Sequence, residues 1–489
     1  MRARGTFILV VMVALTALAM LLPAAIGFSL REHRAARAFL YSAVLLASFA
    51  GLIHLASRGR KGRAERFSHP FYVLTAAYLM LPPIMAVPLT DAVPGLSLSR
   101  AWFEMISSFT TTGASVLDES APLSVHLWRA VVAWAGGAFV LVYALAILAP
   151  MNLGGFEVLT TGATGPSPDG AFRVLDAGAR EGSNGDLGAA LRMVGATYAG
   201  ITVLLWVGLS ITGLPPLRGL ILAMGTLSTS GIYAPGAQAV SPGFAAEVMI
   251  ALVLFTALTR VIWIGPMGGQ RTQWVRTELA LALAVLAIVA VLATSLVPGG
   301  GVAALWAAFF TALSFLTTTG YVSGVAPDGG GLTLGQGGVM LLCMVAIGGG
   351  VATTAGGIKL MRVYALFWQV RHELSHLVHP SSVAGDGPAK RALRREGAFA
   401  AWLFVMIFLF SLTLGIALLT VLGQTLESAL RLMLGALTTT GPLAQTGAAA
   451  MAVPDYAALG GAELSVLSAA MIVGRLDFLL LLSVFWPRR

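Results

Sequence analysis

The sequence predicts an all-α polytopic membrane protein. Of its 489 residues, 57% are hydrophobic and 10% are charged, whereas soluble domains carry roughly 25% charged residues. Apolar runs long enough to cross a bilayer recur along the whole chain. A short polar loop, first seen as "SSFTTTGASVL" at 107–117, returns three times between them. The composition therefore argues against a soluble enzyme, and the repeated loop is the feature that needs an explanation.

About ten apolar runs are predicted to span the membrane. They lie near residues 6–28, 37–57, 70–89, 125–149, 191–212, 244–265, 277–297, 337–370, 396–422 and 463–486. The first is about 23 residues long, against about 7–15 for the core of a signal peptide, so we expect a retained span. Shorter stretches near 99–110, 215–228, 302–316 and 424–437 suit re-entrant segments better than full spans.

Each short apolar stretch ends in a copy of the polar loop. The later copies read "LSTSGIY", "LTTTGYV" and "LTTTGPL", and their glycines follow Gly113 at Gly231, Gly320 and Gly441. After two N-terminal spans, the order span, half-span, loop and span thus occurs four times, which indicates divergent internal duplication. The predicted division is two N-terminal transmembrane helices at 1–66, then pore repeats at 67–153, 189–270, 271–372 and 392–489, with a cytoplasmic loop at 154–188.

The positions of the charges predict the topology. With the N-terminus inside, most Lys and Arg residues fall in cytoplasmic segments, such as 58–66 and 390–395, as the positive-inside rule requires. The net charge of +9 therefore reflects membrane orientation and gives no reason to expect nucleic-acid binding. Both termini are predicted to be cytoplasmic, and all four polar loops face outward.

A Thr-Gly loop after a half-helix can serve a cation. An ion that enters a membrane must exchange its hydration shell for fixed oxygens, and a ring of backbone carbonyls can supply them. Glycine allows the required backbone angles, and the carbonyl end of a helix carries partial negative charge. One such loop alone would be an ordinary helix cap. Four copies on one side of the membrane indicate an ion filter.

At this point the chain resembles the Trk/Ktr/HKT superfamily of potassium transporters, and most of all the Trk-type bacterial uptake subunits. The likeness covers nearly the whole chain and is carried by "FEMISSFTTTGASVL", "LWRAVVAWAGG", "GGGVATTAGGIKLMR", "LVHPSSV" and "GRLD". It implies potassium uptake across the cytoplasmic (inner) membrane and four membrane-pore-membrane units in a pseudo-fourfold array. It also implies a homodimer and a cytosolic nucleotide-binding (RCK-type) regulatory subunit. Potassium is then the transported ion, and no organic cofactor is expected.

The resemblance also implies which residues form the filter. By position they are Thr111, Thr112, Gly113, Thr229, Ser230, Gly231, Thr318, Thr319, Gly320, Thr439, Thr440 and Gly441. The second loop departs from the family pattern, because it reads "STSGIY" where a double glycine and a phenylalanine are common. The strictness of discrimination between K⁺ and Na⁺ is therefore left open.

The eighth apolar run is predicted to be broken in the membrane. Its 34 residues would form a helix of roughly 50 Å, against a hydrocarbon core of about 30 Å. Its glycines could permit close helix packing, or the segment 347–358 could form a loop that gates the cavity below the filter, as the resemblance implies. The gate would comprise Gly348, Gly349, Gly350, Thr353, Thr354, Gly356, Gly357 and Lys359. Lys359 either extends to the cytoplasmic interface or anchors the loop.

A few other polar or aromatic residues lie within the apolar segments. Arg475 should face the protein interior or water, since a midplane arginine costs at least about 2.5 kcal/mol. It either pairs with a carboxylate of a neighbouring element or, as its family counterpart suggests, acts as a positive barrier beside the cavity. Glu104 is a candidate for cation attraction, and Glu427 and Arg431 are spaced as an i,i+4 pair. An interfacial belt is predicted to comprise Trp128, Trp263, Trp274, Phe485 and Trp486.

Two other classes compete with an ion filter. A secondary active transporter (symporter) of another cation or solute also uses broken helices, but it typically contains two large inverted repeats. A membrane enzyme would need a nucleophile and base or a set of metal ligands within the spans, and the sequence presents neither. Coupling to H⁺ or Na⁺ and the nucleotide that a regulatory partner senses are not encoded in any motif.

Overall fold

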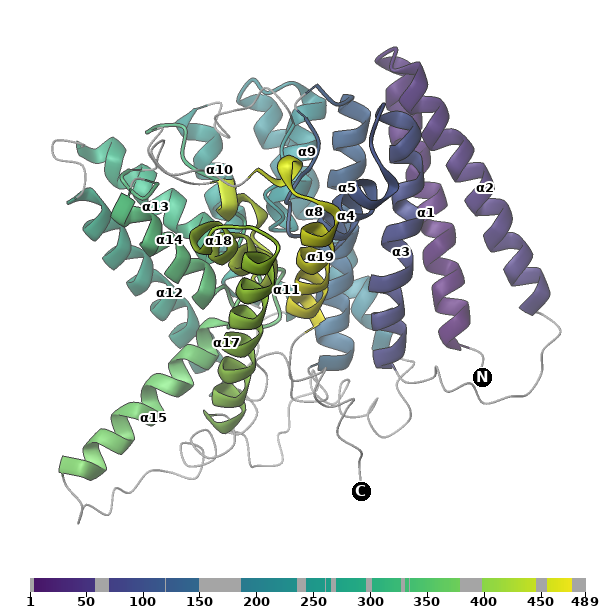
Figure 1. Cartoon of the computed structure of the whole chain (residues 1–489). Coiled ribbons are helices and arrows are strands. Elements are labelled where there is room, and N and C mark those ends of the chain that lie inside the picture. The colour runs from purple at the N-terminus through teal and green to yellow at the C-terminus, as the bar shows by residue number, and fades with distance from the viewer. Residues whose placement is uncertain are drawn as a thin grey trace, which may run out of the picture.

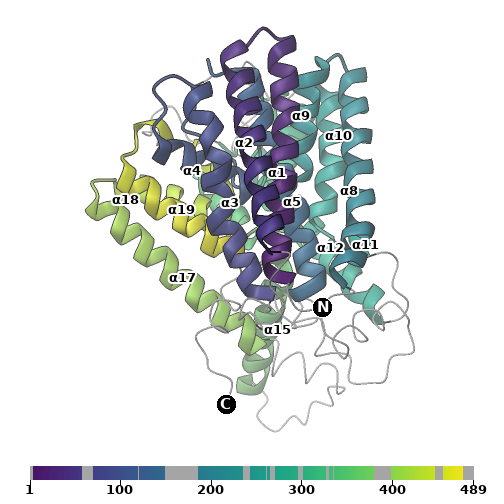
Figure 2. The same cartoon turned by 90° about the vertical axis from the view of Figure 1, so that its right-hand side faces the viewer.

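The chain folds into a bundle of helices in the computed structural model (Figures 1 and 2). The structure describes residues 4–57, 70–118, 120–148, 186–234, 243–259, 261–264, 270–295, 301–326, 330–333, 335–378, 398–445 and 455–476. Every regular element within these ranges is helical. The predicted cytoplasmic loop 154–188 lies almost wholly outside them.

The two N-terminal helices form a hairpin at one edge of the bundle (Figure 1). Helix α1 (Arg4–Ser29) and helix α2 (His33–Ser57) are joined by a tight turn that contains Glu32. The Glu32 carboxylate accepts hydrogen bonds from the backbone N–H groups of Leu123 and Ser124, at 2.8 and 3.0 Å. These N–H groups lie in the first turn of a later long helix, Leu123–Tyr143, and have no partner inside it. The hairpin therefore caps a helix of the first repeat.

Behind the hairpin, the order long helix, short helix, loop and helix occurs four times. The first set is α3 (Pro70–Ala92), α4 (Leu98–Phe109) and α5 (Leu123–Tyr143). The second is α8 (Asp186–Ile211), α9 (Pro216–Leu227) and α10 (Phe244–Leu254). The third is α12 (Gln270–Thr294), α13 (Gly301–Leu316) and α14 (Gly335–Ile347). The fourth is α17 (Ala398–Val421), α18 (Leu426–Leu437) and α19 (Gly461–Leu476).

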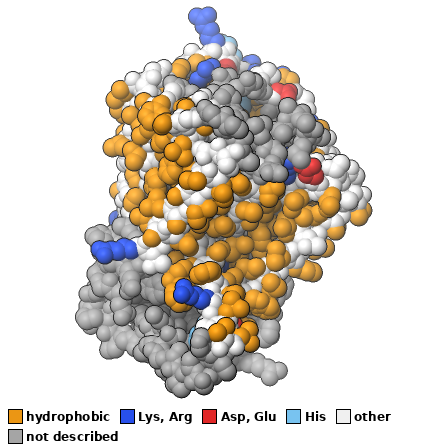
Figure 3. Space-filling view, turned by 90° about the vertical axis from the view of Figure 1, so that its left-hand side faces the viewer, with side chains coloured by type: hydrophobic (Ala, Val, Ile, Leu, Met, Phe, Trp, Pro, Cys, Tyr) orange, Lys and Arg blue, Asp and Glu red, His pale blue; other side chains and the backbone are white. Residues whose placement is uncertain are grey.

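The outer surface of the bundle is that of a membrane protein. Seven described helices are long and apolar enough to span a bilayer. Many of their large apolar side chains face outward, such as Leu45 at 71% and Leu204 at 73% exposure. On the face in Figure 3, hydrophobic side chains cover the middle, and Lys and Arg side chains lie toward its upper and lower ends. Lipid is the solvent that such a surface fits.

Two of the predicted spans are interrupted rather than continuous. The break in 337–370 is confirmed, because α14 ends at Ile347 and α15 (Leu360–Val378) begins only after twelve intervening residues. The span predicted at 244–265 is wrong as a single helix. Helix α10 ends at Leu254, a 3₁₀ turn follows at Phe255–Ala257, and a short α11 occupies Val261–Ile264. The Ala257 carbonyl, freed where α10 ends, accepts a hydrogen bond from Gly350 N–H at 3.0 Å.

Two tryptophans predicted for the interfacial belt are in the core. Trp128 is 1% exposed and Trp263 is 2% exposed. Each indole N–H donates to a backbone carbonyl, from Trp128 to Met85 at 3.2 Å and from Trp263 to Thr256 at 3.1 Å. A buried tryptophan needs such an acceptor, and these carbonyls provide it without water, so the belt prediction fails for this pair.

Candidate filter and gate

The four short helices end at the four polar loops and are buried over their last turns. Each of them, α4, α9, α13 and α18, is 12 to 16 residues long, too short to cross a bilayer. Two begin with a side-chain cap: Ser97 accepts from Arg100 N–H, and Thr425 accepts from Ser428 N–H. Because each loop directly follows the C-terminal end of its short helix, the carbonyl ends of the helices, with partial negative charge, point at the loops.

The backbone of all four loops is built in the same way. The second residue of each four-residue motif (TTTG or STSG) is a threonine in a left-handed conformation, with φ between 55° and 57° at Thr111, Thr229, Thr318 and Thr439. Left-handed backbone costs a non-glycine residue on the order of 1–2 kcal/mol. A strained conformation that recurs four times must be imposed by its surroundings, and these four residues are at most 1% exposed. The shared geometry shows that the loops are structural equivalents.

The loops close into a ring. Each loop glycine lies so near the next loop that an added Cβ would overlap or press on its atoms. The contacts join Gly113 to Ser230, Gly231 to Thr319, Gly320 to Pro442, and Gly441 to Ala114. Loops 1, 2, 3 and 4 thus contact one another in cyclic order, and the last returns to the first. All twelve residues predicted for the filter lie in these loops.

The fourth loop differs from the others at its glycine. Gly113, Gly231 and Gly320 have positive φ, whereas Gly441 begins a 3₁₀ turn that includes Pro442. Gly441 N–H donates to Thr112 O of the first loop at 2.7 Å, and Gly441 O accepts from the Tyr456 hydroxyl at 3.0 Å. Within the described residues, the fourth loop therefore holds the ring shut through hydrogen bonds that have no counterpart in the other loops.

The atypical second loop keeps the shared architecture. Its Ser228 and Ser230 hydroxyls are 3.0 Å apart, as Thr110 and Thr112 are 2.8 Å apart in the first loop. Serine preserves the hydroxyl and loses only the methyl group. In the first and fourth loops, the buried Thr111 and Thr439 hydroxyls have no hydrogen-bond partner within the described residues. These two hydroxyls are free to act as ligands.

The segment between α14 and α15 folds into a loop directly against the inner ends of three filter repeats. Gly356 N–H donates to the Thr318 hydroxyl at 2.8 Å, and the Thr354 hydroxyl lies 3.4 Å from Leu227 O. An added Cβ on Gly356 would overlap with Thr438 O. Residues 348–359, which hold the predicted gate, thus touch repeats two, three and four at once.

Three charged side chains hold this loop. The buried Glu278 carboxylate of α12 accepts from Val351 N–H at 2.8 Å. Lys359, itself left-handed at φ 84°, donates to Ala355 O, so of its two predicted roles the anchor fits. Arg475 Nη1 donates to Thr354 O at 2.7 Å, and its guanidinium also interacts with the Tyr78 side chain of α3. Arg475 contacts the loop backbone and forms no ion pair there.

Two carboxylates of the short helices, Glu104 and Glu427, have structural partners. Glu104 is fully buried, forms an ion pair with Arg129 of α5 and accepts from Val116 N–H at 2.9 Å. This pairing leaves little net charge with which Glu104 could attract a cation. Glu427 and Arg431 form the predicted ion pair at 2.6 Å. The sequence reading missed Glu247 and Glu278, since each is a single carboxylate in an apolar run with no partner nearby in sequence.

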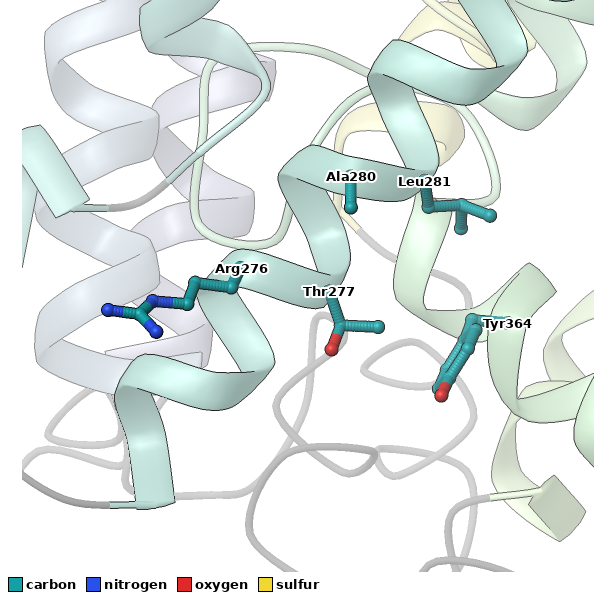
Figure 4. A pocket seen from close by; sticks show the side chains of 5 residues that line it. All are labelled: Arg276, Thr277, Ala280, Leu281 and Tyr364. Carbon is teal, nitrogen blue, oxygen red and sulfur yellow. The ribbon is translucent and has the colours of Figure 1, made fainter.

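A separate cleft of ≈ 510 Å³ opens between α12 and α15 (Figure 4). Its lining is Arg276, Thr277, Ala280, Leu281 and Tyr364. None of these residues belongs to the four loops or to segment 348–359. The cleft is therefore distinct from the ring.

Comparison with known proteins finds similarity to a protein family, to individual sequences and to a solved structure. A family model described as "Cation transport protein" (TrkH) matches residues 334–486. The chain is 28% identical over 431 residues to the Trk system potassium uptake protein TrkI of Halomonas elongata, across 85% of this chain and 83% of that protein. It is 25% identical over 483 residues to the Trk system potassium uptake protein TrkH of Salmonella typhimurium, across 96% and 95%. The crystal structure of the potassium transporter TrkH from Vibrio parahaemolyticus shares the fold, with a TM-score of 0.78 at 22% identity over 98% of this chain and 97% of that one.

These matches agree with the ring and the broken helix. The family model covers the interrupted α14–α15 segment and the fourth repeat, while the relatives and the solved structure extend the likeness to almost the whole chain. The chain is thus similar to the TrkH family of cation transport proteins in residues 334–486 and to Trk system potassium uptake proteins over most of its length.

Proposed function

We propose that this protein carries potassium ions into the cell through the ring of four loops. The observation that carries the proposal is the closed ring itself, with four equivalent left-handed threonines and a buried irregular backbone. Irregular backbone at membrane depth is tolerated where protein buries it or where it lines a wet path. The printed names of the relatives, which describe potassium uptake, support the choice of ion. Similarity to this family supports a transport protein rather than an enzyme.

Under this proposal the four repeats form a pseudo-fourfold array around the ion path. The repeats would occupy 67–153, 189–270, 271–372 and 392–489, after the two N-terminal helices of 1–66. The filter residues would replace the hydration shell of K⁺ with carbonyl and hydroxyl oxygens. Thr112 O and Gly441 O, which already accept hydrogen bonds, would contribute less than the corresponding oxygens of the other loops.

Segment 348–359 would act as the gate. It lies against Thr318 of the third filter loop and is held by Glu278, Lys359 and Arg475. Flux through the ring would require the Gly356–Thr318 hydrogen bond to break, so that the segment can move aside. The positive charge of Arg475 would limit cation leak while the segment is in place.

The assembly and location follow the same proposal. The chain would lie in the cytoplasmic membrane with both termini inside, pair with a second copy and respond to a cytosolic nucleotide-binding subunit. A single copy per particle in native mass spectrometry of the detergent-solubilised protein would contradict the dimer.

The test is rescue of a bacterium that lacks potassium uptake. Expression of the full chain with its regulatory partner should restore growth at low external potassium and should drive ⁸⁶Rb⁺ uptake. If the protein is present in the membrane but neither growth nor ⁸⁶Rb⁺ uptake is restored, the proposed function is wrong. Growth rescue that requires another solute in place of K⁺ would favour the alternative of a symporter for that solute.

A further inference from the structure

Glu247 is a buried carboxylate that connects two repeats. It lies in the first turn of α10, in the second repeat, and is 0% exposed. Its oxygens accept hydrogen bonds from the Ser323 hydroxyl at 2.8 and 2.9 Å, and from Gly324 N–H at 2.7 Å. A further bond comes from the Trp306 indole N–H at 2.6 Å. All these donors belong to the third repeat, so one side chain joins the second repeat to the outer part of the third loop.

The donor set fits an ionised carboxylate. The Gly324 and Trp306 N–H groups can only donate, and they bond to different oxygens of Glu247. Charge-assisted hydrogen bonds of this kind are what makes burial of a carboxylate tolerable. The position at the start of α10 adds the favourable field of the helix N-terminus.

Within the described part of the chain, no Lys, Arg or His neutralises this charge. Glu104 offers the contrast, because Arg129 pairs with it. Arg129 and Glu247 each lie 16 residues after the glycine of their own repeat's loop. The two repeats therefore carry opposite charges at this spacing, and only the second leaves a net negative charge beside a filter loop.

The residues that donate hydrogen bonds to Glu247 lie close to the third filter loop along the chain. Ser323 follows the filter residue Gly320 by three positions. The segment between them is tied to α13 by Tyr321 N–H to Ser314 at 2.5 Å and by Ser323 N–H to Thr311 at 3.3 Å. Glu247 fixes the outer end of this segment from the neighbouring repeat. In a low-dielectric surrounding, a fixed charge acts over longer distances than in water.

We propose that Glu247 positions the third filter loop and supplies the fixed negative charge that attracts cations to the outer end of the filter. The proposal rests on the ion-uptake function argued above. It assigns to Glu247 the apparent affinity for the entering ion and part of the discrimination between K⁺ and Na⁺. Glu104, with its charge paired, has no such role.

The experiment measures ⁸⁶Rb⁺ uptake in the uptake-deficient bacterium that expresses the full chain. Glu247→Gln keeps the size of the side chain but removes its charge, and its amide cannot accept at both positions. We expect the half-saturating Rb⁺ concentration to rise roughly tenfold or more, with weaker discrimination against competing Na⁺. Ser323→Ala and Trp306→Phe, which each remove one donor and keep the charge, should have smaller effects. Glu104→Gln is the matched control and should lower the amount of folded protein while the half-saturating concentration stays unchanged.

The outcomes separate the two proposals. If the wild-type chain shows no uptake, the proposed function fails. If the wild type takes up Rb⁺ and Glu247→Gln has the same half-saturating concentration and the same Na⁺ competition, the assignment of Glu247 is wrong. A loss of maximal uptake alone, with an unchanged half-saturating Rb⁺ concentration and unchanged Na⁺ competition, would show that Glu247 serves only folding. This result would equally overturn the assignment.

Discussion

Thr111 and its three counterparts combine backbone strain with a side chain that can bind an ion. Glycine would adopt φ near 57° at no cost, yet the chain places threonine there four times. Strain of this kind persists where the surrounding structure over-determines it, and it clusters at functional sites. A hydroxyl at these positions gives what glycine cannot, an oxygen beside the ring of carbonyls. The residue choice therefore fits ion coordination better than an ordinary helix cap.

At the same scale, Gly113 tests whether the ring is the ion path. Gly113→Ala adds a Cβ that overlaps with Ser230 O at a residue whose φ is 78°. Overpacking of this kind costs about 1–3 kcal/mol. We expect ⁸⁶Rb⁺ uptake to fall roughly tenfold or more. Gly195→Ala is the control, because Gly195 lies in α8 with nothing within 4 Å of its added Cβ. Equal uptake in the two variants would show that the loops are only caps.

At the scale of elements, two interrupted helices fit together. The end of α10 frees the carbonyl of Ala257, and the segment after α14 presents Gly350 N–H to it. Each interruption satisfies a backbone group exposed by the other, as buried polar groups require. The interruption of one helix in the second repeat and one in the third is thus a single structural feature. It places segment 348–359 below the ring.

The Thr318–Gly356 hydrogen bond predicts that the third filter loop holds the gate segment in place. Thr318→Val removes the acceptor for Gly356 N–H and should raise basal ⁸⁶Rb⁺ uptake several-fold, since an unpaired buried N–H costs about 1–3 kcal/mol. Thr111→Val is the matched control. It alters an equivalent filter residue with the same φ, and its hydroxyl has no partner within the described residues, so it should lower uptake without opening the gate.

Shortening the segment completes this test. In a chain that lacks part of 348–357, Thr318→Val should no longer raise basal uptake, because the bond that it breaks is already gone. Arg475→Gln, which removes the contact with Thr354 O, should also raise basal uptake in the full chain. If Thr318→Val and Thr111→Val behave alike in the full chain, the hydrogen bond does not hold the gate.

At the scale of the whole molecule, the ring exists only when all four repeats are assembled. Its contacts join residues more than 300 positions apart, as at Gly441 and Thr112. The N-terminal hairpin adds to this assembly through Glu32, which caps α5. Loss of any one repeat should therefore remove the ion path entirely rather than reduce it by a quarter.

Orientation in the membrane can be measured on the whole chain. In a Cys343→Ala background, which removes the only cysteine, Asp118→Cys should react with a membrane-impermeant maleimide added to intact cells. Arg371→Cys should react only after the cells are permeabilised. Both positions are exposed in the structure. The reason is the positive-inside rule, which puts the polar loops outside. The reverse labelling pattern would contradict the proposed topology.

Much of the fold could be read from hydropathy, because each helix is encoded locally. The short helices were expected at 99–110 and 424–437, and they occupy Leu98–Phe109 and Leu426–Leu437. The end of α10 could not be predicted in this way. Residues 255–264 are still mostly apolar and contain no Gly or Pro that would signal a break, and their interruption is coupled to a loop almost 100 residues later. Glu247 and Glu278 were missed for the same reason, since their hydrogen-bond partners Gly324 and Val351 lie 77 and 73 residues away in the sequence.

The sequence by itself determined the membrane class, the four loops, their glycines and the broken eighth span, because composition and period are local properties. Only the tertiary structure decided that the loops meet as a ring, that Glu104 is neutralised by Arg129, and that Lys359 binds its own loop. It also decided that "SSFTTTGASVL" shares its strained threonine geometry with three other loops. Contacts between repeats depend on how the helices pack, and no local pattern of residues encodes that packing.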